Sequence, residues 1–99
     1  MKELAFDVVV SYQRDDDQTD THVTVECEKT FSGADSYQQA LDYYEKQKQA
    51  ADRRYTMDEG GLYSCAEVDG KKYVGEYCEF ITPRHAWVGV SMSVRVMNC

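Results

Sequence analysis

The amino-acid sequence predicts an α+β fold: a single two-layer domain over residues 1–99, in which an antiparallel sheet of about five strands carries one helix across one face. Three observations predict it. Most of the chain alternates apolar and polar residues, as half-buried strands do. Residues 36–54 instead space their apolar residues as a helix does. An acidic loop and an Asp-Gly turn each separate two strand-like segments, so the expected order is β-β-α-β-β-β.

The first two strands are expected at residues 4–12 and 22–28. Both segments alternate with a period of two, and the acidic stretch RDDDQTD (residues 14–20) lies between them. This arrangement is typical of a β-hairpin with an acidic loop. The side chains expected to face the helix are Leu4, Phe6, Val8, Val10 and Tyr12 in the first strand and Val23, Val25 and Cys27 in the second.

The helix is expected at about residues 36–54. Either Asp35 or Ser36 is expected to cap it, since each is followed by a glutamine three residues later. Tyr43 lies off the apolar stripe and is expected to be exposed. The stripe expected to pack on the sheet consists of Tyr37, Ala40, Leu41, Tyr44, Ala51 and Tyr55.

A second hairpin is predicted at residues 62–80, after a break at residues 59–61. Asp69-Gly70 is typical of a type I′ turn, in which both central residues have positive φ. Counting outward from this turn pairs residues 64–68 with residues 75–71, so that Glu67 faces Lys72. The same count places Tyr63, Cys65 and Val74 on one face and Tyr73 and Tyr77 on the other.

The last strand, expected at residues 86–97, has the strictest alternation in the chain and is expected to be central, with one apolar face and one mixed face. The mixed face carries Trp87 among small residues, and an exposed Trp in such a setting is typical of an interface anchor. The face expected to be buried consists of Ala86, Val88, Val90, Met92, Val94 and Val96.

Charge bounds the partners of this protein. There are 18 Asp and Glu residues against 11 Lys and Arg, for a net charge of −7, and residues 1–35 carry most of the excess. Such a surface repels nucleic acid and anionic membranes and attracts a basic protein surface. The first ten residues, MKELAFDVVV, do not read as a signal peptide, because two acids interrupt the apolar run. We therefore expect a cytoplasmic protein that contacts neither membrane nor nucleic acid directly.

The acidic loop has three interpretations. Asp15 and Asp17 alternate as calcium ligands do, but the loop lacks the glycine that such a turn needs. Glu26, the twelfth residue when Asp15 is counted as the first, already belongs to a strand. We expect no metal and no cofactor. The remaining interpretations are a solvated turn and a tip that contacts a partner.

No enzymatic motif is present. The chain has no nucleophile elbow, no phosphate-binding loop and no zinc spacing among its four cysteines. The remaining enzymatic alternative is a nucleophilic site formed by Cys78 and His85. Aromatic side chains on a sheet also stack RNA bases, but RNA binding needs a positive electrostatic field, and this chain is negatively charged. The sequence therefore predicts a protein that is not an enzyme.

Small size, strong acidity, high tyrosine content, a lone α+β domain and the absence of a catalytic motif occur together in one known group. In these features the chain resembles the small anti-CRISPR inhibitors encoded by phages and mobile elements. The resemblance implies a stoichiometric binder that occupies the basic nucleic-acid channel of a CRISPR effector complex, or blocks its assembly.

The expected function is binding to a basic protein surface. The alternative is a small structural subunit that forms a homodimer through the second hairpin and Trp87. The residues expected to contact the partner are Asp15, Asp16, Asp17, Asp20, Glu26, Glu28, Tyr43 and Trp87.

Overall fold

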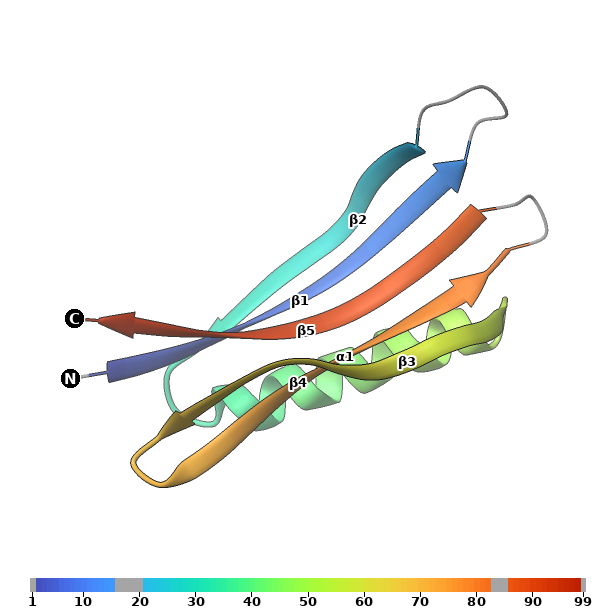
Figure 1. Cartoon of the computed structure of the whole chain (residues 1–99). Helices are drawn as coiled ribbons and strands as arrows, with labels where there is room; N and C mark the ends of the chain where they lie inside the picture. The colour runs from blue at the N-terminus through green and yellow to red at the C-terminus, as the bar shows by residue number, and fades with distance from the viewer. Residues whose placement is uncertain (1, 16–20, 83–85, 99) are drawn as a thin grey trace.

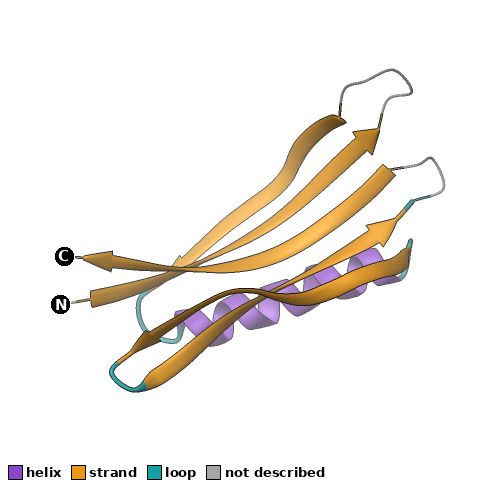
Figure 2. Cartoon of the chain, in the orientation of Figure 1, coloured by secondary structure: helices purple, strands orange, loops and turns teal. Residues whose placement is uncertain are grey.

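The computed structural model describes residues 2–15, 21–82 and 86–98. All strand pairs are antiparallel, in the order β2-β1-β5-β4-β3, and α1 lies along one face of the sheet (Figure 1, Figure 2). The predicted fold class, element order and central last strand are confirmed. The elements are β1 (Lys2–Asp15), β2 (Thr21–Ser32), α1 (Ser36–Asp52), β3 (Thr56–Val68), β4 (Lys71–Ile81) and β5 (Ala86–Asn98).

The core lies between α1 and the sheet. The predicted buried face of β5 is confirmed for its first four members, whereas Val96, near the strand's end, is exposed. From β1, Phe6 and Val8 are fully buried, and Tyr44 is the largest fully buried side chain. Tyr44 belongs to α1, the only helix in the described part of the chain. This helix is not long and apolar enough to cross a membrane. The core members are Phe6, Val8, Ala40, Tyr44, Ala51, Cys78, Phe80, Val88, Val90 and Met92.

The helix begins as predicted but is capped differently. Gly33 has φ 90° and Asp35 has φ 60°, so the chain enters α1 through two left-handed residues. Asp35 occupies the N-cap position, yet its side chain makes no capping hydrogen bond. The predicted side-chain cap is therefore wrong. The Ser36 N–H instead donates to the Gly33 carbonyl at 3.3 Å.

The second hairpin confirms the register predicted from its turn. Residues 64–68 pair with residues 75–71, and Asp69 and Gly70 both have positive φ. The predicted break at residues 59–61 is wrong, because β3 runs through it. The Tyr77 ring lies against Gly61, where an added Cβ would lie 3.4 Å from the ring. An aromatic side chain across from a glycine is a known way to support it within an edge strand.

A β-bulge reverses the alternation of β2. Val10 pairs with Cys27, but Ser11 pairs with Val25, so Glu26 is the extra residue. Cys27 faces α1 as predicted. Val25 is 53% exposed on the opposite side, and its predicted burial is wrong. One extra residue reverses the alternation between the two sides of the bulge, so Val25 and Cys27 face opposite sides of the sheet although they are two residues apart. The side chain of Val23 lies outside the described part.

A bulge in β3 has the same effect on Tyr63. The register shifts between Leu62 and Ser64, so Tyr63 leaves the face of Cys65. Its ring instead packs edge-on against Tyr77, with centroids 6.1 Å apart. The prediction that Tyr63 shares a face with Cys65 is therefore wrong.

Two tyrosines of β4, Tyr73 and Tyr77, reach opposite sides of the sheet. Tyr77 pairs with Ser91 of β5, on the side away from α1. A Cβ at Gly75 would overlap the Met92 carbonyl oxygen, so the backbones of β4 and β5 touch there. Tyr73 then packs on Phe6 and Tyr37 on the α1 side. Tyr73 and Tyr77 share one face of the hairpin but lie on opposite sides of the sheet.

Candidate functional site

The predicted acidic loop cannot be placed from the structure. Asp16, Asp17 and Asp20 lie outside the described residues. Asp15 is the last residue of β1 and Glu26 is the bulge residue of β2, but the side chains of both lie outside the described part. Their role as partner contacts stays a prediction.

The other three predicted contact residues divide between the two sides of the molecule. Glu28 pairs with Val9 and Trp87 pairs with Gln13, and both alternate away from the core. They lie on the side of the sheet opposite α1, which we call the open face. Tyr43 belongs to α1, on the other side. The predicted set is therefore not one surface.

Tyr43 is not the exposed residue that its position on the helix predicts. Its hydroxyl lies 2.9 Å from Cys27 Sγ, and its ring packs on Phe31 with centroids 5.6 Å apart. Lys29 Nζ lies 5.0 Å from the centre of the Tyr43 ring. These contacts leave the side chain half-buried, so Tyr43 helps to attach β2 to α1.

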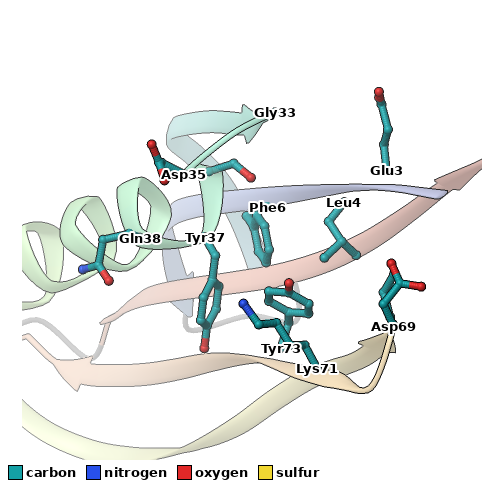
Figure 3. Close-up of a pocket in the computed structure, with 12 residues that line it drawn as sticks. Glu3, Leu4, Phe6, Gly33, Asp35, Tyr37, Gln38, Asp69, Lys71 and Tyr73 are labelled. Carbon is teal, nitrogen blue, oxygen red and sulfur yellow. The ribbon is translucent and has the colours of Figure 1, made fainter. Parts of the chain in front are cut away.

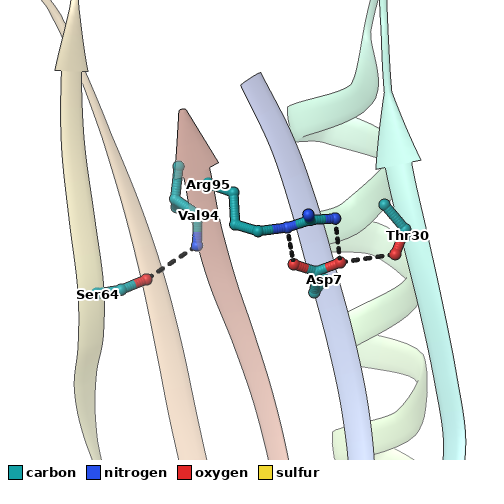
Figure 4. A network of polar contacts seen from close by, with 5 residues as sticks. All are labelled: Asp7, Thr30, Ser64, Val94 and Arg95. Atoms are coloured by element: carbon teal, nitrogen blue, oxygen red, sulfur yellow. Dashed lines mark hydrogen bonds and ion pairs between the residues drawn. The ribbon is translucent and has the colours of Figure 1, made fainter. Parts of the chain in front are cut away.

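Asp7 is an acid of the open face whose charge is already neutralised (Figure 4). Its carboxylate accepts hydrogen bonds from Arg95 Nε at 2.6 Å, Arg95 Nη2 at 3.1 Å and Thr30 Oγ1 at 2.6 Å. Burial raises the pKa of Asp7, but the bonds from Arg95 and Thr30 and the charge of Arg95 outweigh it and hold that pKa below 3.8. This group links the three strands β1, β2 and β5.

Replacing Asp7 by asparagine is expected to lower the free energy of unfolding by about 1–3 kcal/mol near neutral pH, because hydrogen bonds to charged groups are lost. The folded-state pKa lies below the ordinary value of 3.8, so the carboxylate stabilises the fold above that pH and loses this contribution as the pH falls below it. Urea unfolding at about pH 7 and about pH 2 tests this.

The control for Asp7→Asn is Glu28→Gln, at an exposed position on the same face, where an effect below about 0.5 kcal/mol is expected. The difference between Asp7→Asn and the parent should shrink on acidification. A difference that is equal at both pH values would contradict the role of the ionised carboxylate.

The strand registers arrange the open face in rows that cross the sheet. In the first two of these rows, β5 carries the small residues Ser91 and Gly89, and the neighbouring β4 carries the larger Tyr77 and Glu79. One row contains Glu28, Val9, Ser91, Tyr77 and Gly61; the next contains Val25, Ser11, Gly89, Glu79 and Glu59; a third contains Gln13, Trp87, Ile81 and Thr56.

A hollow of about 380 Å³ lies where the small and large residues meet. We call it the open-face hollow. The Tyr77 hydroxyl donates to Glu59 Oε1 at 2.9 Å, and this bond raises the pKa of Tyr77, so its hydroxyl stays protonated at neutral pH. The hollow is lined mainly by Ser11, Gly89 and Ser91 and by Glu59, Tyr63, Tyr77 and Glu79.

Three further glutamates lie on the open face. Within the described part of the chain, none of Glu28, Glu59 and Glu79 forms an ion pair within 4.0 Å, and the one described ion pair joins Arg95 to Asp7. The described acids of the open face are therefore one predicted residue, Glu28, and two that were not predicted, Glu59 and Glu79. Sequence reasoning missed Glu59 and Glu79, which the β3 bulge moves into register with each other.

A larger hollow, about 500 Å³, lies at the start of α1 beside the β3–β4 turn (Figure 3). Its aromatic residues are Phe6, Tyr37 and Tyr73, whose ring centroids lie 5.1–5.9 Å apart. These rings pack on one another and belong partly to the core. Three acids, Glu3, Asp35 and Asp69, line it together with Lys71, whereas the lining of the open-face hollow has carboxylates and no basic side chain. The open-face hollow is chemically the more specific of the two.

The enzymatic alternative receives no support from the position of Cys78. This residue is 2% exposed, and burial raises the pKa of its thiol, whereas a nucleophilic cysteine needs a lowered pKa. His85 lies outside the described residues. Within the described ranges, no three His, Cys, Asp or Glu side chains are grouped to hold a metal ion.

Comparison with known proteins adds no relative. No family model, no curated protein and no solved structure matches this chain.

Proposed function

We propose that this protein is a non-enzymatic binding protein whose open face occupies a basic surface of a nucleic-acid-handling protein complex. The observation that carries the proposal is the charge of that face. None of Glu28, Glu59 and Glu79 forms an ion pair within 4.0 Å with a described side chain, while Arg95 is bound to Asp7. The partner class that the anti-CRISPR resemblance suggests is a CRISPR effector, whose channels carry many basic side chains.

The composition of the open face suits such a contact. Unpaired carboxylates increase the rate of association with a basic partner. Trp87, Tyr63 and Tyr77 supply aromatic surface beside them, and aromatic residues are enriched among the anchors of protein interfaces. The small residues of β1 and β5 leave room for a partner's side chains to approach the sheet.

Reversing the charge of the open face is expected to abolish rapid association. The variant Glu28→Lys, Glu59→Lys, Glu79→Lys should lower the association rate at low salt by at least about tenfold, because it inverts the steering field. Surface plasmon resonance against a panel of purified CRISPR effector–guide complexes at low and moderate salt measures this rate. Parallel assays record inhibition of target-DNA binding.

The matched control for the open-face variant is Asp42→Lys, Glu45→Lys, Asp52→Lys, which changes net charge equally at exposed positions of α1. This variant should retain most of the association rate. Equal loss in both variants would show a nonspecific charge effect, and no loss in either would remove the open face from the interface.

A second candidate function is self-association. Val25, Tyr63 and Ile81 are exposed large apolar residues, and all three belong to the open face or its rim. Exposed apolar groups of this kind are typical of an interface. Light scattering at high micromolar concentration separates the two candidates, since the subunit hypothesis requires a dimer there.

A further inference from the structure

The open-face hollow contains two carboxylates placed directly opposite each other. Glu59 of β3 pairs with Glu79 of β4. Side chains that face each other across antiparallel strands have Cβ atoms roughly 5 Å apart, and like charges in this position destabilise a sheet. The Tyr77 hydroxyl offers one hydrogen bond to Glu59 but no positive charge. A cation between the two carboxylates would remove the repulsion.

Two tyrosine rings stand beside these carboxylates. Tyr63 and Tyr77 meet edge-on with centroids 6.1 Å apart, and Tyr63 is 57% exposed, so part of its ring surface is open to a ligand. The face of an aromatic ring attracts a cation. Carboxylate and ring therefore favour the same sign of charge in one hollow.

The remaining walls admit a slender side chain. Ser11, Gly89 and Ser91 lie on the central strands, where a Cβ added to Gly89 would lie 3.2 Å from Ser11 Oγ. A side chain larger than that of glycine would therefore crowd Ser11 at this wall of the hollow, and the serine hydroxyls are additional hydrogen-bond acceptors. The hollow's volume of about 380 Å³ accommodates a long side chain rather than a folded segment.

We infer that the open-face hollow binds one arginine side chain of the partner protein, with its guanidinium between Glu59 and Glu79 and against the ring of Tyr63. This inference rests on the proposed function and names its anchor. A guanidinium presents five N–H donors in a plane, stacks on aromatic rings and is less strongly hydrated than an ammonium. Two carboxylates, serine hydroxyls and an open ring match arginine better than lysine.

The test is a titration of the isotope-labelled protein with acetyl-Gly-Arg-Gly-amide, followed by two-dimensional NMR. The same peptide with citrulline, a neutral analogue of arginine, and with lysine serve as comparisons. The arginine peptide should shift the amide signals of Gly61, Gly89 and Ser91. It should bind at least about tenfold more tightly than the citrulline peptide, since cation–π and ion-pair contributions together reach about 1.4 kcal/mol.

Two variants test the assigned residues. Glu59→Gln, Glu79→Gln should lose the preference for arginine over citrulline, and its melting temperature should not fall, because repulsion is removed. Asp42→Asn, Glu45→Gln on α1 is the matched control and should keep the preference. The comparison of peptides on the unaltered protein stands whether or not a variant folds.

Several outcomes would overturn the inference. These are equal affinity for the arginine and citrulline peptides, equal affinity for the lysine peptide, or shifts confined to residues outside the hollow. If the peptide test fails while the triple charge reversal still removes partner binding, only the arginine anchor is wrong. If the peptide binds as expected but that reversal leaves partner binding intact, the proposed function is wrong and the arginine site stands.

Discussion

Replacing Gly75 by alanine is expected to lower the free energy of unfolding by about 3 kcal/mol, at the upper end of the usual range for overpacking. An added Cβ would overlap the Met92 carbonyl oxygen and lie 2.8 Å from Ser64 Oγ. The Ser64 hydroxyl already accepts a hydrogen bond from the Val94 N–H at 2.9 Å, so it is not free to move away (Figure 4). The backbones of β4 and β5 must therefore separate. Urea unfolding followed by circular dichroism measures the effect.

The control for Gly75→Ala is Gly61→Ala in the same hairpin. At Gly61 the new Cβ would lie 3.4 Å from the nearest atom, a carbon of the Tyr77 ring, which is an ordinary contact. Its expected effect is below about 1 kcal/mol, because alanine also restricts the unfolded chain. If both variants were equally stable, β4 would not approach β5 as closely as the structure shows.

Replacing Tyr44 by alanine is expected to lower the free energy of unfolding by about 3–5 kcal/mol, as for other large aromatic residues removed from a core. Tyr44 is 1% exposed and is the largest fully buried side chain that α1 packs against the sheet. A domain has a total stability of about 5–15 kcal/mol, so this loss is a large share of it and the melting temperature should fall well below that of the parent protein. Thermal unfolding measures the loss.

Two further variants separate the causes of the Tyr44 effect. Tyr44→Phe keeps the ring and removes the hydroxyl, whose pKa is raised chiefly by burial, so the hydroxyl is neutral throughout the working pH range. This variant should lose far less stability than Tyr44→Ala. Tyr43→Ala, at the neighbouring half-buried position, should fall between them. A small effect of Tyr44→Ala would mean that α1 contributes little to the core.

The elements could be predicted because they depend on neighbours in the chain. The alternation of β5, the spacing of apolar residues in α1 and the Asp69-Gly70 turn each act within a few residues. The hairpin register was predictable for the same reason, as far as residues 64 and 75, where no bulge intervenes. These segments match the structure closely.

The candidate site could not be predicted because it depends on bulges. Extending the hairpin count past residue 64 would place Glu59 opposite Phe80, on the same face as Phe80 and on the opposite face from Glu79. The bulge at Tyr63 changes that partner to Glu79 and brings the two carboxylates together. The bulge at Glu26 likewise turns Val25 outward. Neither bulge residue, Glu26 or Tyr63, is a glycine, and the nearby Gly60-Gly61 pair suggests irregular pairing in β3 without identifying the extra residue.

The sequence by itself determined the α+β class, the order of the elements, the buried face of the central strand and the excess of negative charge. Each of these follows from composition or from local periodicity, which act along the chain. Only the tertiary structure decided which acids are neutralised, since Asp7 meets Arg95 across the sheet. It also decided that Glu59, Glu79, Tyr63 and Tyr77 share one hollow, because strand pairing and twist bring together residues that the chain keeps apart.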